Sequence, residues 1–302
     1  MKPAGFLIGV QILAALSLFG CGPSAAPSQL PRGYFGPTLP LDQVIDHINA
    51  NNARVPTLWT HIRYFEANSV DRKTGNEQFV NGDQGTLLYT APQSIRLTVN
   101  KQVADLFIMG SDGQQYWFWQ KHDNLFYRGA YANLDKPHTV EIPIRPDLVV
   151  EVLGVRPIQS QLTREPVPVL RFNNDADAYT IVWQTHLDDR WVAQKEIWYD
   201  RRTFLPETVV LFDANGRIML RAYLSNFVPV ESADSAADQR PKVATHFKLF
   251  FPETNTHAVF DLADVSLKNG KFPVPASFAM PSLQQLSESG NKVIDIDEET
   301  GP

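Results

Sequence analysis

The chain has very little cysteine. Its 302 residues contain a single one, Cys21. One thiol cannot form an intrachain disulfide, and it cannot supply the cysteine sets that hold structural zinc. Disulfides and cysteine-ligated metals are therefore excluded as supports of this fold.

Positive charge is also in deficit. The chain has 27 Lys and Arg against 33 Asp and Glu, a formal net charge of −6 at pH 7 with neutral histidines, and no basic patch stands out. Nucleic-acid-binding domains show the opposite balance, with Lys and Arg gathered on one face. We therefore expect no nucleic acid among the partners.

Local signatures of catalysis and metal binding are missing as well. The histidines form no HxH or HExxH pair, and neither a GxSxG elbow nor a phosphate loop occurs. We expect no enzyme activity, no cofactor and no bound metal. A glycosidase pair stays open, because its two carboxylates can come from any part of a chain. The histidines lie at positions 47, 61, 122, 138, 186, 246 and 257.

Acidic residues do occur close together in turn-like segments. Asp188 with Asp189, and Asp175 with Asp177, are interpreted as solvated. Near the end of the chain the acidic residues of 295–299 could attract a cation, but they lack the glycine and the spacing of an EF-hand loop.

What the chain does have is a hydrophobic leader. Lys2 supplies a positive start, and the run from Ala4 to Gly20 carries no charge. The run is slightly short for a spanning helix of ~20 residues and ends in small residues, as an export signal does. We therefore interpret residues 1–20 as a signal peptide.

The leader ends in Leu18-Phe19-Gly20-Cys21, which resembles a bacterial lipobox, although Phe19 is bulkier than the usual residue. The resemblance implies lipidation of Cys21 and a membrane anchor. Gly22, rather than an aspartate, follows the cysteine and favours the outer membrane over the inner one. An ordinary leader with an accidental cysteine is the alternative.

The next segment is rich in proline, serine, alanine and glycine, and with Cys21 it makes residues 21–40 a lipidated flexible tether. The folded region then opens at Leu41. Val44, Ile45 and Ile48 continue from Leu41 the apolar stripe of an amphipathic helix, which Asn51-Asn52 would end. A short helical or extended piece from Leu58 to Tyr64 follows.

From residue 64 to about 133 the pattern is that of short strands separated by turn residues, including an expected turn at Asn81-Gly82-Asp83. Asp112-Gly113 and, later, Asn215-Gly216 are hairpin signals of the type I′ kind. Between Leu134 and Ile158 we expect a loop with one short helix over the sheet. Strands then resume, and residues 282–302 are interpreted as an acidic flexible tail.

Five stretches, in this order, carry a resemblance to the LolA/LolB-like superfamily of bacterial envelope lipoprotein carriers and receptors. It covers most of residues 41–281 and implies one mainly β (α+β) domain: a strongly curved antiparallel sheet forming a half-open barrel, with short helices covering its concave face. The chain is longer than the soluble carrier and has its own anchor site. The stretches are LDQVIDHINANN, GTLLYTAPQSIRLTV, SDGQQYWFWQKHDN, FLPETVVLFDANGRIMLRAYLSNF and DLADVSLKNGKFPVPASFAMP.

Several expected strands are apolar at consecutive positions, so both of their faces must be covered. One face could line an apolar groove for acyl chains, and a closed core in which protein covers every aromatic is the alternative. The candidate cavity-lining residues are Ile45, Ile48, Leu88, Leu97, Phe107, Trp117, Trp119, Phe126, Trp183, Ile197, Tyr199, Val210, Phe212, Leu220, Phe247 and Leu249.

The leading hypothesis is a periplasmic lipoprotein, anchored through Cys21, that binds a lipid or the acyl chains of a lipoprotein in lipid or lipoprotein trafficking. The anchor favours a receptor, a tethered carrier or a sensor over a free shuttle. The alternative is a structural or envelope-sensing lipoprotein with a filled barrel, which acts through contacts with an envelope protein.

Overall fold

The computed structural model describes residues 37–70, 75–102, 104–134, 142, 144–231, 239–267 and 272–298. The predicted signal peptide, the lipidation site Cys21 and most of the predicted tether lie outside these residues. Within them, no helix combines the length and the apolar character that crossing a membrane requires.

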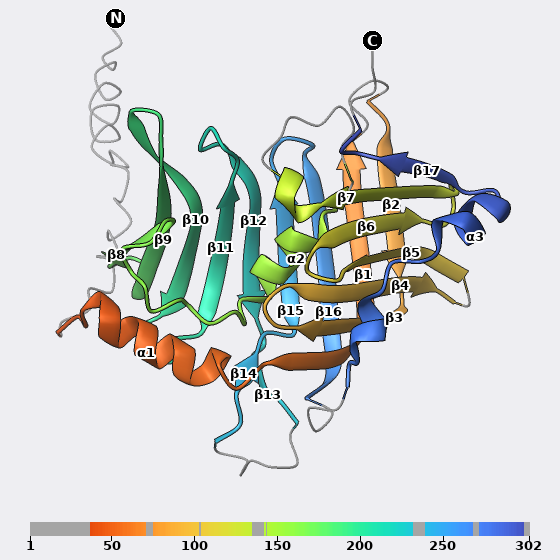
Figure 1. Ribbon diagram of the computed structural model, residues 1–302. Coiled ribbons are helices and arrows are strands. Elements are labelled where there is room, and N and C mark those ends of the chain that lie inside the picture. The colour runs from red at the N-terminus through yellow and green to blue at the C-terminus, as the bar shows by residue number, and fades with distance from the viewer. Residues whose placement is uncertain are drawn as a thin grey trace, which may run out of the picture.

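The described strands form one large sheet that does not close into a barrel, as the sequence predicted (Figure 1). Its edge strands are β17 and β8, and its order is β17-β7-β6-β5-β4-β3-β1-β16-β15-β12-β11-β10-β9-β8, with β2 also paired to β1. The strands of the sheet are β1 (Thr57–Val70), β2 (Glu77–Gly82), β3 (Gln84–Thr90), β4 (Ser94–Lys101), β5 (Ala104–Ser111), β6 (Gln115–Gln120), β7 (Leu125–Ala130), β8 (Val167–Asn173), β9 (Ala178–Leu187), β10 (Arg190–Asp200), β11 (Pro206–Phe212), β12 (Ile218–Ser225), β15 (His246–Phe251), β16 (Thr256–Ser266) and β17 (Lys292–Asp295); β13 (Val228–Pro229) and β14 (Lys242–Val243) form a separate pair.

The sheet bends at β1, the long strand that joins its two halves. One side of β1 pairs with β16, and its other side pairs first with β3 and then with β2 in the same register, with a gap between the pairs His61–Thr86 and Phe65–Gly82. Beyond this gap β3 to β7 run at a large angle to β8–β12 (Figure 1). The turn predicted at Asn81-Gly82-Asp83 is therefore wrong. Gly82 serves close packing instead, because a Cβ there would lie 2.5 Å from Cγ1 of Val99.

Two helices accompany the curved sheet. Helix α1 (Leu41–Asn52) crosses the ends of β8–β11 and buries the predicted stripe of Val44, Ile45 and Ile48 (Figure 1). Helix α2 (Pro146–Leu153) is the short helix expected before residue 158, and it packs on the concave face against β4, β5, β6 and β11. It ends at Gly154, whose φ of +67° suits glycine.

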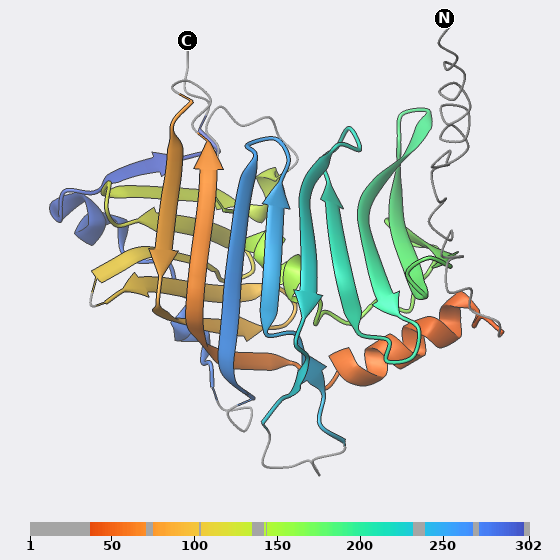
Figure 2. The same ribbon diagram turned by 180° about the vertical axis from the view of Figure 1, so that it is seen from behind.

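The last described segment covers the convex face of β5–β7. Helix α3 (Leu283–Glu288) buries Leu286 against Ile108, Trp117 and Phe126, and β17 pairs in parallel with β7. The interpretation of residue 282 onward as a flexible tail is therefore wrong as far as residue 298. Its polar composition was misleading because a few apolar side chains, Leu283, Leu286, Val293 and Ile296, are enough to pack it on the sheet. Seen from behind, no helix of the described residues lies over the convex face of β9–β12, β15 and β16 (Figure 2).

The two predicted hairpins are present, but their turns are not type I′. Only the glycine of each pair, Gly113 and Gly216, has a positive φ, whereas type I′ needs it at both central residues. An aspartate side chain organises each turn instead. Asp112 accepts hydrogen bonds from the backbone N–H of Gln114 and Gln115, and Asp213 plays the corresponding part in the second turn.

Candidate ligand-binding cavity

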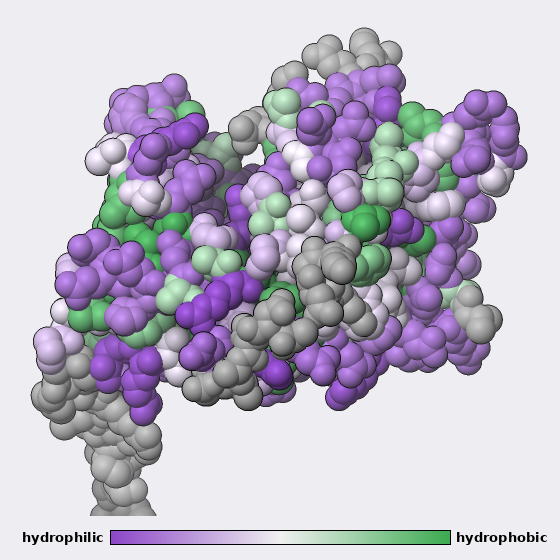
Figure 3. All heavy atoms as spheres, turned by 60° about the horizontal axis from the view of Figure 1, so that its bottom comes forward, coloured by the Kyte–Doolittle hydropathy of each residue, from purple (hydrophilic) through white to green (hydrophobic). Residues whose placement is uncertain are grey.

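A cavity of about 330 Å³ lies on the concave side, between strands β9 and β10 and the segment 154–168. Trp183, Ile197 and Tyr199 form its strand wall, and Ile158 with Pro157 and Pro166 lines it from segment 154–168. Viewed from below, hydrophobic surface is recessed between hydrophilic side chains on this part of the molecule (Figure 3). Apolar side chains thus form part of the walls, and polar and charged side chains form the larger share of the lining.

Strand alternation places the strand wall. Trp183 is paired with Lys195, and Ile181 with Ile197, so the inward side chains of β9 and β10 alternate with outward ones such as Glu196. Trp183, Ile197 and Lys195 consequently share the concave face. Their indole, sec-butyl and ammonium groups meet at the same end of the sheet.

The segment over the cavity is held by asparagine side chains from the last turn of α1. Asn49 Nδ2 donates to the Ile158 carbonyl at 2.8 Å, and the Ile158 N–H donates to Asn49 Oδ1 at 2.7 Å. Asn52, which is 2% exposed, donates from Nδ2 to the carbonyls of Gly154 and Arg156. We refer to Asn49 and Asn52 as the asparagine clamp. Sequence reasoning took Asn51-Asn52 only as a helix end and missed this role.

The floor of the cavity is charged. Glu151 of α2 forms ion pairs with Arg156 and, at 2.7 Å, with Lys195, whose ammonium also lies 4.6 Å from the centre of the Trp183 ring. Burial alone would raise the pKa of Glu151, but these two cations outweigh it and hold the pKa below its usual value. Burial raises the pKa of Tyr199, which therefore stays neutral. Glu151 is ionised at neutral pH.

Of the predicted cavity residues, Trp183, Ile197 and Tyr199 line this cavity and the others do not. Many are packed in the closed core of the concave side, and three belong to the cluster under α3 on the convex side. The first group comprises Ile45, Ile48, Leu97, Phe107, Leu220, Phe247 and Leu249, and the second Trp117, Trp119 and Phe126; Leu88 and Val210 are buried elsewhere, and Phe212 is half-buried.

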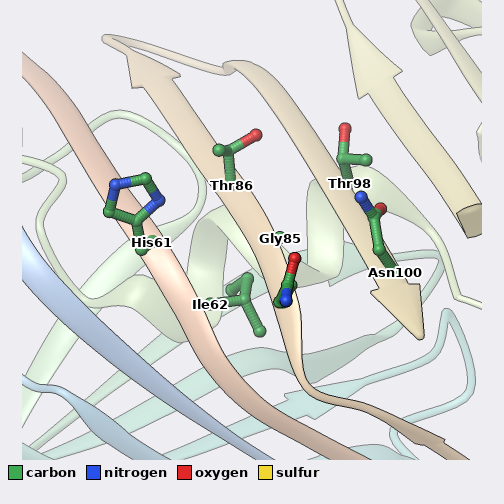
Figure 4. Close-up of a pocket in the computed structure, with 7 residues that line it drawn as sticks. His61, Ile62, Gly85, Thr86, Thr98 and Asn100 are labelled. Carbon is green, nitrogen blue, oxygen red and sulfur yellow. The ribbon is translucent and has the colours of Figure 1, made fainter. Parts of the chain in front are cut away.

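A second hollow, of about 430 Å³, lies where β1 and β3 separate at the bend of the sheet. The side chains of His61, Thr86 and Thr98 project on the same side of β1, β3 and β4, and Asn100 lies beside them (Figure 4). This hollow is open, and His61 is the only titratable side chain that lines it. It offers hydroxyl and amide groups, with Ile62 as its large apolar side chain.

Three of the acidic residues singled out in the sequence, Asp177, Asp295 and Asp297, have specific partners. Asp177 pairs with Arg201 at 2.7 Å, so its interpretation as merely solvated is wrong. Asp295 pairs with Arg128, and Asp297 Oδ2 accepts a hydrogen bond from the Ala130 N–H. In the part of the chain that the structure describes, no group of three or more His, Cys, Asp or Glu could hold a metal ion.

Comparisons with known proteins bear on the fold alone. No protein-family model matches the chain, and no curated protein matches it. A solved DUF1329 family protein from Desulfovibrio piger covers 80% of this chain and 98% of its own, with 11% identity and a TM-score of 0.50. A LolA superfamily protein from Nitrosomonas europaea covers 80% of this chain and 99% of its own, with 13% identity and a TM-score of 0.45. A putative outer membrane lipoprotein-sorting protein domain from Vibrio parahaemolyticus covers 82% of this chain and 98% of its own, with 9% identity and a TM-score of 0.46. LolA-type structures are thus among the similar folds, as the sequence resemblance predicted.

Proposed function

We propose that this chain binds the acyl part of a lipid or lipoprotein in the cavity beneath segment 154–168, at the periplasmic side of the cell envelope, with Cys21 as its membrane anchor. The observation that carries the proposal is the recess walled by Trp183, Ile197 and Ile158 on the concave face. Concave apolar sites with a few polar groups are the usual form of small-molecule sites. Burial of an acyl chain there supplies the affinity, at ~25 cal/mol per Å².

The size of the cavity limits what it holds. At about 330 Å³ it lies near the lower end of ligand pockets, which span ~300–1,000 Å³. A single chain therefore suits it better than several. A larger ligand requires segment 154–168 to move away from β9 and β10, against the hydrogen bonds of the asparagine clamp.

The test is lipid binding by the purified full-length chain. Mass spectrometry of its solvent extract should find a co-purified lipid, and a fluorescent acyl probe should bind and be displaced by dodecanol. Ile197→Trp fills the cavity and should abolish probe binding. Val169→Trp, at a position 41% exposed on edge strand β8, adds the same side chain outside the cavity and should not. No lipid and no probe binding in the wild type would refute the proposal.

A second candidate function is a structural or sensing protein that acts through protein contacts. It is favoured by the closed core over most of the concave side and by exposed aromatic side chains, among them Phe79 (58% exposed), Trp191 (56%) and Tyr223 (48%). A stoichiometric envelope protein in a pull-down that is lost in Tyr223→Ser, together with absent probe binding, would favour this function.

A further inference from the structure

The charged floor of the cavity has more donor capacity than its own carboxylate uses. An ammonium has three N–H donors and a guanidinium five. Lys195 Nζ donates to Glu151 Oε2 and Arg156 Nη1 to Glu151 Oε1. Within the described residues, Glu151 is the only ion-pair partner of either cation. Their side chains are 23% and 35% exposed, so both can be reached from the cavity.

The lining as a whole has an excess of positive charge. Lys195, Arg156 and Arg164 face the cavity against Glu151 and Glu165. Arg164 is exposed at the mouth, and no carboxylate pairs with it in the part of the chain that is described. An anion that enters therefore meets one more cation than acid. The partly buried setting strengthens this attraction relative to open water.

The position of Glu151 argues against a cationic ligand group. Each of its two oxygens already accepts a hydrogen bond from a cation, so a ligand ammonium at Glu151 would lie beside Lys195 and Arg156 and be repelled by both. A neutral head can accept hydrogen bonds from these two cations but brings no negative charge to balance the positive lining. A carboxylate or phosphate oxygen satisfies the same donors with charge-assisted hydrogen bonds.

We propose that the ligand is an anionic amphiphile, whose carboxylate or phosphate head lies between Lys195 and Arg156 while its chain lies along Trp183 and Ile197. This inference rests on the proposed function, since it assigns a head group to the same cavity. It adds a preference that apolar burial cannot give, because a chain of given length buries the same surface whatever its head.

The test compares amphiphiles that have different head groups and the same acyl or alkyl chain length. Dodecanoate, dodecyl phosphate and dodecanol compete at neutral pH for the acyl probe bound to the full-length chain, with inorganic phosphate as a head without a chain. Both acidic amphiphiles should bind at least about tenfold more tightly than dodecanol, as one charge-assisted hydrogen bond implies. Inorganic phosphate alone should not displace the probe.

Three variants test which residues cause the tighter binding of acidic amphiphiles relative to dodecanol. Lys195→Met should remove most of it without weakening dodecanol, and Glu151→Gln should increase it by removing the competing carboxylate. Lys121→Met is the matched control, because Lys121 lies 3.0 Å from the centre of the Trp119 ring outside the cavity and should leave all affinities unchanged. Thermal melts establish that each variant is folded.

The outcomes separate the two proposals. Equal binding of dodecanol and dodecanoate, with no effect of Lys195→Met, overturns the anionic head while acyl binding stands. Absence of binding by every amphiphile overturns the proposed function itself. Displacement of the probe by inorganic phosphate alone would mean that the acyl chain of the ligand does not contribute to binding. That result also contradicts the inference.

Discussion

The clearest quantitative prediction concerns Asn52 of the asparagine clamp. Its side-chain amide is almost fully buried and donates to the carbonyls of Gly154 at 3.1 Å and Arg156 at 3.0 Å. Asn52→Ala removes both donors and leaves two half-buried carbonyls without this partner. An unsatisfied buried polar group costs ~1–3 kcal/mol. Since water can reach these carbonyls in part, the lower end of ~1 kcal/mol applies to each, and for the two together we expect a loss of ~2 kcal/mol in the free energy of unfolding.

The assay is urea and thermal unfolding of the full-length chain. A loss of ~2 kcal/mol corresponds to a Tm lower by ~4–8 °C for a domain of roughly this size. Amide hydrogen exchange should also accelerate at Ile158, whose N–H donates to the neighbouring Asn49. Asn215→Ala is the control, because Asn215 is exposed in a hairpin turn and should change stability by less than ~0.5 kcal/mol.

The reasoning is refuted if Asn52→Ala is as stable as Asn215→Ala, or if it loses stability while exchange at residues 154–158 stays the same. The first result would mean that the two hydrogen bonds do not contribute. The second would place the effect within α1 and not in the segment over the cavity.

Three further predictions concern the sheet. Leu286→Ala should cost ~2–5 kcal/mol in urea unfolding by opening the cluster under α3, whereas the exposed neighbour Gln285→Ala should not. Gly110→Ala places a Cβ 2.6 Å from Trp117 and should cost ~1–3 kcal/mol; the cost should shrink in a Trp117→Phe background. Burial raises the pKa of Tyr89 to about 12. The free energy of unfolding should therefore be constant below about pH 10 and fall by ~1.4 kcal/mol per pH unit as the pH rises toward 12. An unchanged urea midpoint between about pH 9 and 11 would contradict this.

The sequence was sufficient for the antiparallel sheet and for the first two helices. Alternation and aromatic content identify strands locally, and the stripe from Val44 to Ile48 identifies α1, so these features need no knowledge of distant contacts. The open, curved form of the sheet came from the resemblance of ordered stretches and not from any single pattern. The bend at β1 was missed because Gly82 has the composition of a turn and only its packing against Val99 shows otherwise.

The cavity was predictable only in part because consecutive apolar residues give no sign of which face of a strand lines it. Trp117 and Trp183 stand in similar runs, yet the first lies under α3 and the second in the cavity. The asparagine clamp had no sequence signal, since Asn52 meets its carbonyl partner 102 residues away. Pairing of Glu151 with Lys195 likewise joins a helix and a strand that are distant in the chain.

The parallel pairing of β17 with β7 has a consequence for synthesis. The edge of β7 is completed by residues that emerge long afterwards, since Ala130 and its partner Asp297 are 167 residues apart. At ~5–20 residues per second, the ribosome leaves this edge open for roughly 10 to 30 s. During that interval the unpaired strand and the apolar surface around Trp117 are exposed to aggregation. The first half of the sheet therefore stays without its edge strand until residues 292–295 have been made.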